Sequence, residues 1–223
     1  MSATLGSGAR AAWLGQPAPD LEEAERTPYP ALWRSDQPHP LPCSTASDTA
    51  PAKTVEPCLV PTMDPEEAAR FAVEAADNGA RVLVVRNTVK MAVATWEVIV
   101  AMAPSLLLEV ANGPALHHSR FAAEDRRRLD TAVEGALGKG SPTRGLIAVG
   151  TQTLEQSLDI DADLLVTDLC PIDVLLQRIG RLHRHSNRNR PPGFEQARVH
   201  VLCPSRGLDL LAREGRLENG LGS

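Results

Sequence analysis

The sequence is short of aromatic residues and of long apolar runs, and both shortages narrow what the protein can be. Aromatic side chains make up 3% of the 223 residues, so a folded core must be built from Ala, Val, Leu and Ile. No apolar run approaches the roughly 18 residues that a membrane-spanning helix needs. Residues 1–10 also lack the hydrophobic stretch of an export signal. We therefore expect a cytoplasmic protein with no membrane partner.

Cysteine is equally sparse. The chain has four cysteines, with no Cys-x-x-Cys pair and no histidine at ligand spacing. This pattern argues against a zinc site, and a chain without an export signal is not expected to carry a disulfide framework. We predict no metal site in this chain. The cysteines are Cys43, Cys58, Cys170 and Cys203.

Lysine is scarce too, and positive charge is not in excess. The 23 basic residues comprise 3 lysines and 20 arginines, and the formal net charge is -5. This balance excludes a surface that is basic everywhere, so any contact with nucleic acid must come from a local patch. Arginine is the residue best suited to bidentate contacts with phosphate.

Composition divides the chain into three parts. Residues 1–54 are rich in Pro, Ser, Ala and Thr with little apolar periodicity, so we expect a disordered segment or an interdomain linker. Residues 55–205 alternate between strand and helix patterns, which predicts an α/β domain with a parallel sheet flanked by helices. Residues 206–223 are expected to be a truncated tail. The expected helices span residues 64–78, 88–101, 121–137 and 173–184, and the expected strands 81–85, 115–118, 145–149, 164–168 and 197–202.

The expected topology indicates where a site should lie. In open parallel sheets, ligands bind beyond the carboxyl ends of the strands. This rule selects the loops that follow Val85, His118, Val149 and Asp168. Those loops carry the unusual polar residues of the sequence, so we expect functional residues there.

The strongest motif is the basic segment Gln177 to Arg184, with the sequence QRIGRLHR. On a helix, Gln177, Arg181 and Arg184 share one face. Arg178 is rotated off that face. A fixed row of guanidinium groups suits the neutralisation of charge on a phosphoryl group in transit. The alternative is a basic helix face that is solvated or lies on nucleic acid.

A second motif, Val149 to Asp161 (VGTQTLEQSLDID), follows an expected buried strand. Gly150 permits a tight turn. Thr151 and Thr153 offer hydroxyl and N–H groups where a helix N-terminus favours a phosphate. Asp159 is a candidate acceptor for the hydroxyl groups of a ribose. The alternative is a capped turn and a surface acid.

Two weaker motifs come earlier in the chain. Val84 to Lys90 (VVRNTVK) is an expected strand that ends in polar groups, and His117 to Phe121 (HHSRF) is a short block before an expected helix. Each motif is weak evidence of function alone. Its order and spacing relative to the other motifs strengthen that evidence.

Taken together, these motifs resemble motifs four to six of superfamily 2 nucleic-acid helicases. Residues 153–161, 176–185 and 190–195, with the block at 118–121, further resemble the CRISPR-associated helicase-nuclease of type I systems, over about residues 81–202. The resemblance implies a motor of two RecA-like domains, of which this chain carries the second. It implies ATP as cofactor, with Mg2+ held by the missing first domain. The motor would unwind DNA and reel in the non-target single strand recruited by a guide-RNA surveillance complex, in antiviral defence.

By matching positions, the resemblance also implies a role for each polar residue. The catalytic residues would be the arginine fingers Arg181 and Arg184. ATP-binding would fall to Gln177, Asp159 (on the ribose), Gly150 and Arg178, the last of these being structural or a link between motifs. The nucleic-acid-binding residues would be Thr151 and Thr153, which couple DNA to ATP, with Asn87, Thr88, Ser119 and Arg120.

Two segments imitate motifs of the first motor domain. Gly138 to Ser141 imitates a P-loop, but a glycine follows its lysine and no strand leads into it, so we expect a flexible loop. Asp64 to Glu67 imitates a Walker B acid, but it begins an expected helix. The sequence also has no His-Asp dipeptide to anchor the nuclease metals of the family.

Three interpretations of the chain follow. It is a truncated or split product, inactive alone, whose first RecA-like domain is supplied by an upstream polypeptide; or an inactive remnant; or a stand-alone nucleic-acid-binding module. The first predicts ATPase activity when the partner is added. The second predicts poor folding, and the third predicts DNA binding without a partner.

Overall fold

A computed structural model describes residues 7–27, 31–34, 36–37, 39–42, 53–142, 144–155, 158–185 and 188–205. The chain forms two compact units, residues 1–53 and 54–223. The assignment of residues 1–54 to a disordered segment or linker stays a prediction, and residues 206–223 lie outside the described residues. The described part of the first unit contains α1 (Ser7–Leu14), α2 (Leu21–Arg26), and the paired strands β1 (Ala31–Leu32) and β2 (Leu41–Pro42).

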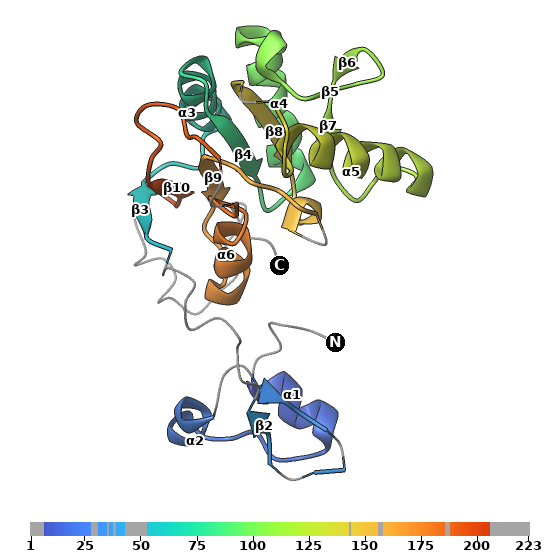
Figure 1. The fold of residues 1–223 in the computed structure, drawn as a ribbon, viewed down its shortest axis with the longest axis vertical. Helices are drawn as coiled ribbons and strands as arrows, with labels where there is room; N and C mark the ends of the chain where they lie inside the picture. Colours follow the sequence, from blue (N-terminus) through green and yellow to red (C-terminus); the bar gives the residue numbers. More distant parts are fainter. Residues whose placement is uncertain are drawn as a thin grey trace. The chain divides into compact units, whose positions relative to one another are not determined.

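The second unit is built on a six-stranded sheet in which every pair of neighbouring strands is parallel (Figure 1). The strand order is β3-β10-β9-β4-β8-β7. Strands β4, β8 and β9 are buried along their whole length, as expected for a parallel sheet covered on both faces. The strands are β3 (Val55–Val60), β4 (Arg81–Val85), β7 (Leu116–His117), β8 (Leu146–Gly150), β9 (Leu164–Asp168) and β10 (Ala197–Leu202).

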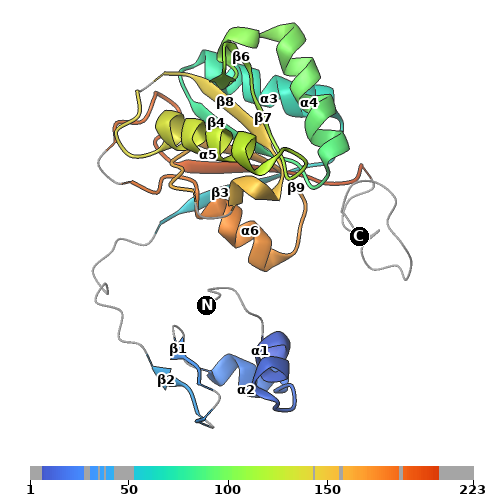
Figure 2. The same cartoon turned by 90° about the vertical axis from the view of Figure 1, so that its right-hand side faces the viewer.

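Helices cover both faces of this sheet (Figure 2). In β4, Val82 and Val84 join the core under α3 and α4, whereas Leu83 and Val85 join the core under α5 and α6. This alternation follows from the two-residue period of a strand. The predicted α/β fold with a parallel sheet flanked by helices is confirmed. The helices are α3 (Pro65–Asp77), α4 (Val89–Met102), α5 (Ala123–Leu137) and α6 (Ile172–Ile179).

Helix α3 begins and ends where the sequence predicts. Asp64 Oδ1 accepts a hydrogen bond from the Glu66 N–H at 3.0 Å, and Pro65 occupies the first helical position. Beyond the C-cap, Gly79 has φ of +86°, a left-handed conformation that costs glycine little. The acidic segment at 64–67 is therefore a helix start, as expected.

Between α4 and β7 the structure contains elements that the sequence pattern did not predict. A 3-10 turn, η1 (Pro104–Leu106), is followed by a small antiparallel pair, β5 (Glu109–Val110) and β6 (Gly113–Pro114). Ala111 and Asn112 form the turn between these strands, and both have positive φ. Alanine is rarely found in such a turn, so the sequence did not indicate it. In the part of the chain that the structure describes, no helix is long and apolar enough to cross a membrane.

Helix α6 ends earlier than the sequence predicts. It stops at Ile179, whereas the pattern predicted a helix to Arg184. Arg181 and Arg184 therefore lie beyond the helix that carries Gln177. The prediction that these three side chains share one helix face is wrong.

The early end of α6 has a packing reason. After Gly180 the chain turns, and Leu182 pairs with Ala162 in a parallel bridge. The His183 N–H donates to the Ala162 carbonyl oxygen at 3.0 Å. Leu182 is fully buried in the core under α5 and α6, and burial of such a side chain contributes about 1.5–3 kcal/mol. A continued helix would not bring Leu182 to this position.

Gly145 is expected to be intolerant of any side chain. A Cβ at this position would lie 1.8 Å from the carbonyl oxygen of Ala76 in α3. We expect Gly145→Ala to lower the free energy of unfolding by about 1–3 kcal/mol, because backbone must move. Gly135→Ala, on the exposed side of α5 with nothing within 4 Å, is the control and should raise it by about 0.5–1 kcal/mol. Urea unfolding followed by circular dichroism measures both, and equal stabilities would contradict the packing.

Candidate nucleotide and nucleic-acid sites

The structure divides the predicted site residues into two groups. One group lies in the loops at the carboxyl ends of β4, β7 and β8. The other lies near the amino end of β9, where the chain after α6 returns to pair with Ala162. The first group contains Asn87, Thr88, Ser119, Arg120, Gly150, Thr151 and Thr153; the second contains Asp159, Arg181 and Arg184, while Gln177 and Arg178 lie on α6.

Backbone hydrogen bonds hold the loops of the first group side by side. The Arg86 N–H donates to the Gly150 carbonyl oxygen at 2.9 Å. The Thr151 N–H donates to the His117 carbonyl oxygen at 3.0 Å. The loops after β4, β8 and β7 therefore form one continuous edge, which we call the carboxyl edge.

Asn87 and Thr88 use their polar groups to hold the loop after β4. The Asn87 N–H donates to Asp168 Oδ2 at 2.7 Å, and its side-chain amide donates to the Leu169 carbonyl oxygen at 2.8 Å. Thr88 Oγ1 caps α4 by accepting a hydrogen bond from the Met91 N–H at 3.2 Å. Both side chains are half-buried, so each retains a surface toward solvent.

Gly150 has a packing reason to be glycine. A Cβ at this position would lie 2.4 Å from the His117 carbonyl oxygen and 2.6 Å from Leu154 Cδ1. The close approach of β7 and of the turn after β8 therefore excludes a side chain here.

Thr151 and Thr153 point inward, not toward solvent. Thr151 is buried, and its Oγ1 has no partner among the described residues. Thr153 Oγ1 lies 2.6 Å from Nδ1 of the buried His117, whose Nε2 lies 2.6 Å from Asp130 Oδ1. Burial lowers the pKa of His117, so the ring is neutral at pH 7 and Nε2 carries the proton that the carboxylate needs. Nδ1 must then accept from the Thr153 hydroxyl, which ties β7 to α5 and to the turn after β8.

Ser119 and Arg120 are exposed in the turn between β7 and α5. The Arg120 N–H donates to His118 Nδ1 at 3.2 Å. Its guanidinium has no hydrogen-bond or ion-pair partner in the described ranges of the chain. This side chain is therefore available to a ligand.

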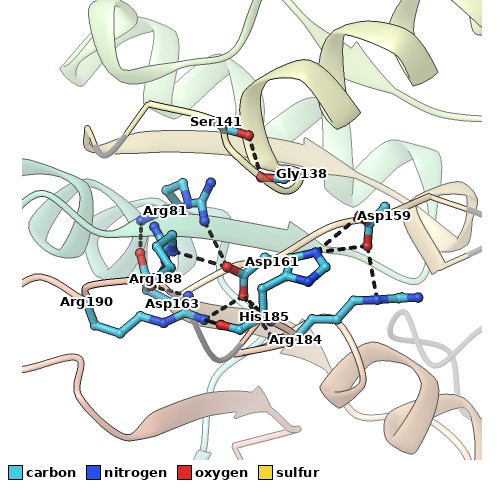
Figure 3. A network of polar contacts seen from close by, with 10 residues as sticks. All are labelled: Arg81, Gly138, Ser141, Asp159, Asp161, Asp163, Arg184, His185, Arg188 and Arg190. Carbon is cyan, nitrogen blue, oxygen red and sulfur yellow. Dashed lines mark hydrogen bonds and ion pairs between the residues drawn. The ribbon is translucent and has the colours of Figure 1, made fainter.

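In the second group, Asp159 and Arg184 form an exposed pair. Arg184 Nε lies 3.1 Å from Asp159 Oδ1, and their side chains are 43% and 45% exposed. His185 Nε2 lies 3.1 Å from both Asp159 oxygens (Figure 3). The Asp159 N–H donates to Glu134 Oε1 at 3.0 Å, which ties this corner to α5. The pair presents one carboxylate and one guanidinium at the surface.

Arg181 is anchored to the backbone of the segment after β8. Its guanidinium donates to the carbonyl oxygens of Glu155 and Leu158. Burial, with the neighbouring Arg184, lowers the pKa of Arg181. Its Nε is buried without a hydrogen-bond partner among the described residues. Arg181 therefore holds the chain that leads to Asp159, and its buried Nε–H is left without an acceptor within the described ranges.

Arg178 is a buried link between α6 and the turn η2 (Gln152–Glu155). Its Nε donates to Glu155 Oε1 at 2.7 Å, and its Nη1 donates to Thr167 Oγ1 at 2.6 Å. Only 3% of Arg178 is exposed. Gln177 is its neighbour on α6 and is half-buried.

A buried ion network lies beneath the Asp159–Arg184 pair (Figure 3). Asp161 Oδ1 accepts hydrogen bonds from Arg190 Nη2 at 2.7 Å and from the Arg184 N–H at 2.8 Å. Asp161 Oδ2 accepts a hydrogen bond from Arg81 Nη2 at 3.0 Å and lies 3.1 Å from Arg188 Nε. Asp161 thus fixes the backbone position of Arg184.

Asp163 completes the network at the start of β9. Its Oδ2 accepts the Arg81 N–H at 2.8 Å, and its Oδ1 accepts Arg190 Nη1 at 2.9 Å. Arg188 also donates to Asp163 Oδ1. The two carboxylates share their arginine partners, so the loop after α6 is bound to the first residues of β4 and β9.

The balance of charge keeps the network ionised despite its burial. Burial alone would raise the pKa of Asp161, but Arg190, Arg188 and Arg81 outweigh it and hold the pKa below its usual range. Burial, with repulsion from Arg188, lowers the pKa of Arg81 to about 10. Both groups are therefore charged at neutral pH.

Sequence reasoning missed several of these residues. Neither the network arginines nor the His117–Asp130 pair stood out, although an Asp-x-Asp before an apolar strand is an unusual place for two acids. The expected loop at Gly138 to Ser141 is a turn, because Ser141 Oγ donates to the Gly138 carbonyl oxygen at 2.6 Å and Gly140 has φ of +83°.

Comparison with known proteins relates this geometry to a family. Residues 78–187 match the family described as CRISPR-associated nuclease/helicase Cas3, C-terminal. Over 136 residues the chain is 40% identical to the CRISPR-associated endonuclease/helicase Cas3 of Escherichia coli (strain K12), a match that covers 59% of this chain. It covers 14% of that protein, so the chain spans a small part of its relative.

Solved structures agree with this likeness. The chain is similar to the crystal structure of T. fusca Cas3-ATP, with a TM-score of 0.62 and 31% identity over 77% of this chain and 20% of that one. It is also similar to a chain in a structure described as a CRISPR RNA-guided surveillance complex, pre-nicking, with a TM-score of 0.62 and 26% identity. That match covers 92% of this chain and 27% of the other.

Removing one carboxylate of the network should destabilise the fold. We expect Asp161→Asn to lower the free energy of unfolding at pH 7 by about 3–5 kcal/mol, because buried arginines lose their counter-charge. The pKa of Asp161 is lowered in the folded state, so its contribution is complete above the unfolded value, about 3.9, and is lost as pH falls through the folded value. The difference in free energy of unfolding between wild type and variant should therefore become smaller in acid.

Urea unfolding at pH 7 and pH 3 measures this difference, and Asp173→Asn, on the exposed start of α6, is the control. A difference that stays the same at both pH values would contradict the assignment.

Proposed function

Since this chain carries a C-terminal RecA-like domain of the Cas3 helicase-nucleases, we propose that it forms the second half of an ATP-dependent DNA motor. The motor would unwind DNA in antiviral defence, with ATP between this domain and a first RecA-like domain. The two groups of residues take different roles. The group near the amino end of β9 faces the nucleotide, and the carboxyl edge faces the DNA.

The exposed Asp159–Arg184 pair supports the nucleotide site. Arg184 reaches solvent from a backbone that Asp161 holds in place, so its guanidinium can exchange Asp159 for a phosphate without unfolding the loop. Asp159 is then released to accept hydrogen bonds from a ribose. Arg184 would stabilise the charge of the phosphoryl group in transit as an arginine finger.

Arg181 is the second proposed finger, and its neighbours on α6 support it. Its guanidinium is half-buried and has N–H groups beyond the two that bind the Glu155 and Leu158 carbonyl oxygens. These further donors suit a phosphate oxygen, while the two bound ones keep the segment after β8 in position. Gln177 would contact the nucleotide from α6. Arg178, fully engaged with Glu155 and Thr167, would act within the ATP site as the link between motifs.

The carboxyl edge supports contact with the DNA backbone. Arg120 offers an unpaired guanidinium beside the exposed Ser119, and the loop with Asn87 and Thr88 lies on the same edge. Arginine, serine, threonine and asparagine side chains are among the groups that donate hydrogen bonds to phosphate oxygens. Thr151 and Thr153 lie directly beneath this edge.

A single observation carries the proposal of a motor over that of a passive binding module. The segment after β8 starts at the carboxyl edge, where Thr153 is bound to His117, and continues to Asp159 in the proposed nucleotide site. Between these ends, the Glu155 carboxylate accepts from Arg178 and its carbonyl oxygen accepts from Arg181. A displacement at the DNA side would therefore move groups that hold both arginines, which is the coupling that a motor needs.

Hydrolysis would need more than the domain described here. A first RecA-like domain would hold Mg2+ and the phosphates of ATP, so we expect this chain to be inactive without that domain. By analogy with a structural relative, the assembled motor would act beside a guide-RNA surveillance complex, on a single DNA strand. The second candidate is a nucleic-acid-binding module without catalysis.

ATP hydrolysis tests the function most directly. We expect DNA-stimulated hydrolysis when the purified chain is mixed with the polypeptide encoded immediately upstream, and none from the chain alone. Hydrolysis in neither sample, with a folded circular-dichroism signal, would contradict the motor. Titration with single-stranded DNA would then separate a binding module, which binds, from a remnant, which does not.

In the active mixture, Arg184→Ala tests the proposed finger. We expect kcat to fall about a thousandfold or more, because one of the two proposed fingers no longer neutralises the phosphoryl group, while DNA affinity is retained. Arg181→Ala should show the same loss and also lower thermal stability, because the Glu155 and Leu158 carbonyl groups lose their donor. Arg70→Ala, an exposed arginine on α3 across the sheet, is the control and should keep full activity. Near-normal turnover by Arg184→Ala would rule out the finger.

A further inference from the structure

Two aromatic rings, those of His118 and Phe121, are stacked on each other in the turn between β7 and α5. The centroids of His118 and Phe121 lie 4.3 Å apart, and their planes differ by 12°. Phe121 is 38% exposed, although aromatic residues make up only 3% of the chain. A large apolar ring therefore faces solvent beside Arg120, in a protein that has few such rings.

The orientation of the pair is set by a hydrogen bond. The Arg120 N–H donates to His118 Nδ1 at 3.2 Å, so Nδ1 is an acceptor and the proton of the neutral ring is on Nε2. Burial lowers the pKa of His118, which keeps the ring neutral at pH 7. The pair is thus an uncharged flat surface with a fixed direction, and binding a ring there costs little ordering entropy.

The charge around this pair is positive. Arg120 and Arg126 have no ion-pair partner in the described ranges of the chain. The acids that follow in α5 do not cancel this charge: residues 118–130 contain four arginines and three acids, and two of these acids, Glu124 and Asp125, face Arg128 at 3.0 and 4.0 Å. In a chain of net charge -5, this is the kind of local basic patch that attracts phosphates.

We propose that the His118–Phe121 pair is a stacking platform for one unpaired nucleobase, and that Arg120 and Arg126 hold the phosphates on either side. This inference rests on the proposed function and adds to it a base contact at one end of the carboxyl edge. The ligand is a single strand, because a duplex does not offer the face of a base. Stacking on the platform does not discriminate between bases, since every base has a π-face. Binding without sequence preference suits a motor that moves along DNA.

The experiment uses the full chain and single-stranded DNA with 2-aminopurine scanned along the oligonucleotide. Stacking on the platform quenches the fluorescence of 2-aminopurine at one position. We expect Phe121→Leu to abolish that quenching and to weaken binding roughly tenfold, because base–aromatic stacking contributes about 1–3 kcal/mol. Phe121→Trp should retain both. An abasic site at the quenched position should make wild type and Phe121→Leu bind alike.

The salt dependence of binding separates the platform from the phosphate contacts. Phe121→Leu should leave the salt slope unchanged, whereas Arg120→Ala should reduce it by about 1. Phe71→Leu, the same substitution on α3 across the sheet, is the control, and thermal unfolding checks that each variant is folded. A wild type that binds DNA while Phe121→Leu binds equally well and quenches equally overturns the platform alone. A folded wild type that binds no single strand overturns the DNA-binding role as well.

Discussion

Asp161 holds in place the part of the domain that regular secondary structure leaves unsupported. Among the described residues between α6 and β10 there is no helix or strand, yet this stretch carries Arg184. Its backbone is positioned because Asp161 accepts the Arg184 N–H together with the guanidinium groups of Arg81 and Arg190. A buried carboxylate is tolerated only with such a set of partners, so the loop and the first residues of β4 and β9 behave as one unit.

This constraint gives the two candidate sites a common frame. The proposed nucleotide-binding residues Asp159, Arg181 and Arg184 are attached to the amino ends of the strands through the ion network. The carboxyl edge is attached to α5 through the neutral ring of His117. The segment after β8 joins them, with Glu155 bound by both Arg178 and Arg181. Polar contacts of this kind have directional partners, so a displacement of one group changes the positions of the groups bound to it.

Local patterns predicted most of the fold. The predicted bounds of β9 and β10 match the structure. Strand β9 is buried along its whole length, whereas β10 alternates between buried Ala197 and Val199 and the exposed Arg198, and both patterns are properties of the local sequence. Helix α3 was predicted from the residues at its two ends. Asp64 caps its N-terminus and Gly79 adopts a left-handed conformation after its C-terminus, and both depend on local geometry alone. The β5–β6 pair was not predicted, since an alanine such as Ala111 gives no signal of a turn with positive φ. The end of α6 was not predicted either, since it depends on the pairing of Leu182 with Ala162, a residue distant in sequence.

By itself, the sequence determined the α/β class and the order of its polar motifs, because apolar periodicity and capping are properties of short segments. Only the tertiary structure decided what each arginine of QRIGRLHR contacts. Arg178 is buried against Glu155, Arg181 is anchored to backbone carbonyls, and Arg184 is exposed beside Asp159. Similar side chains differ in this way because burial and ion pairing are set by residues more than twenty positions away, which no local pattern contains.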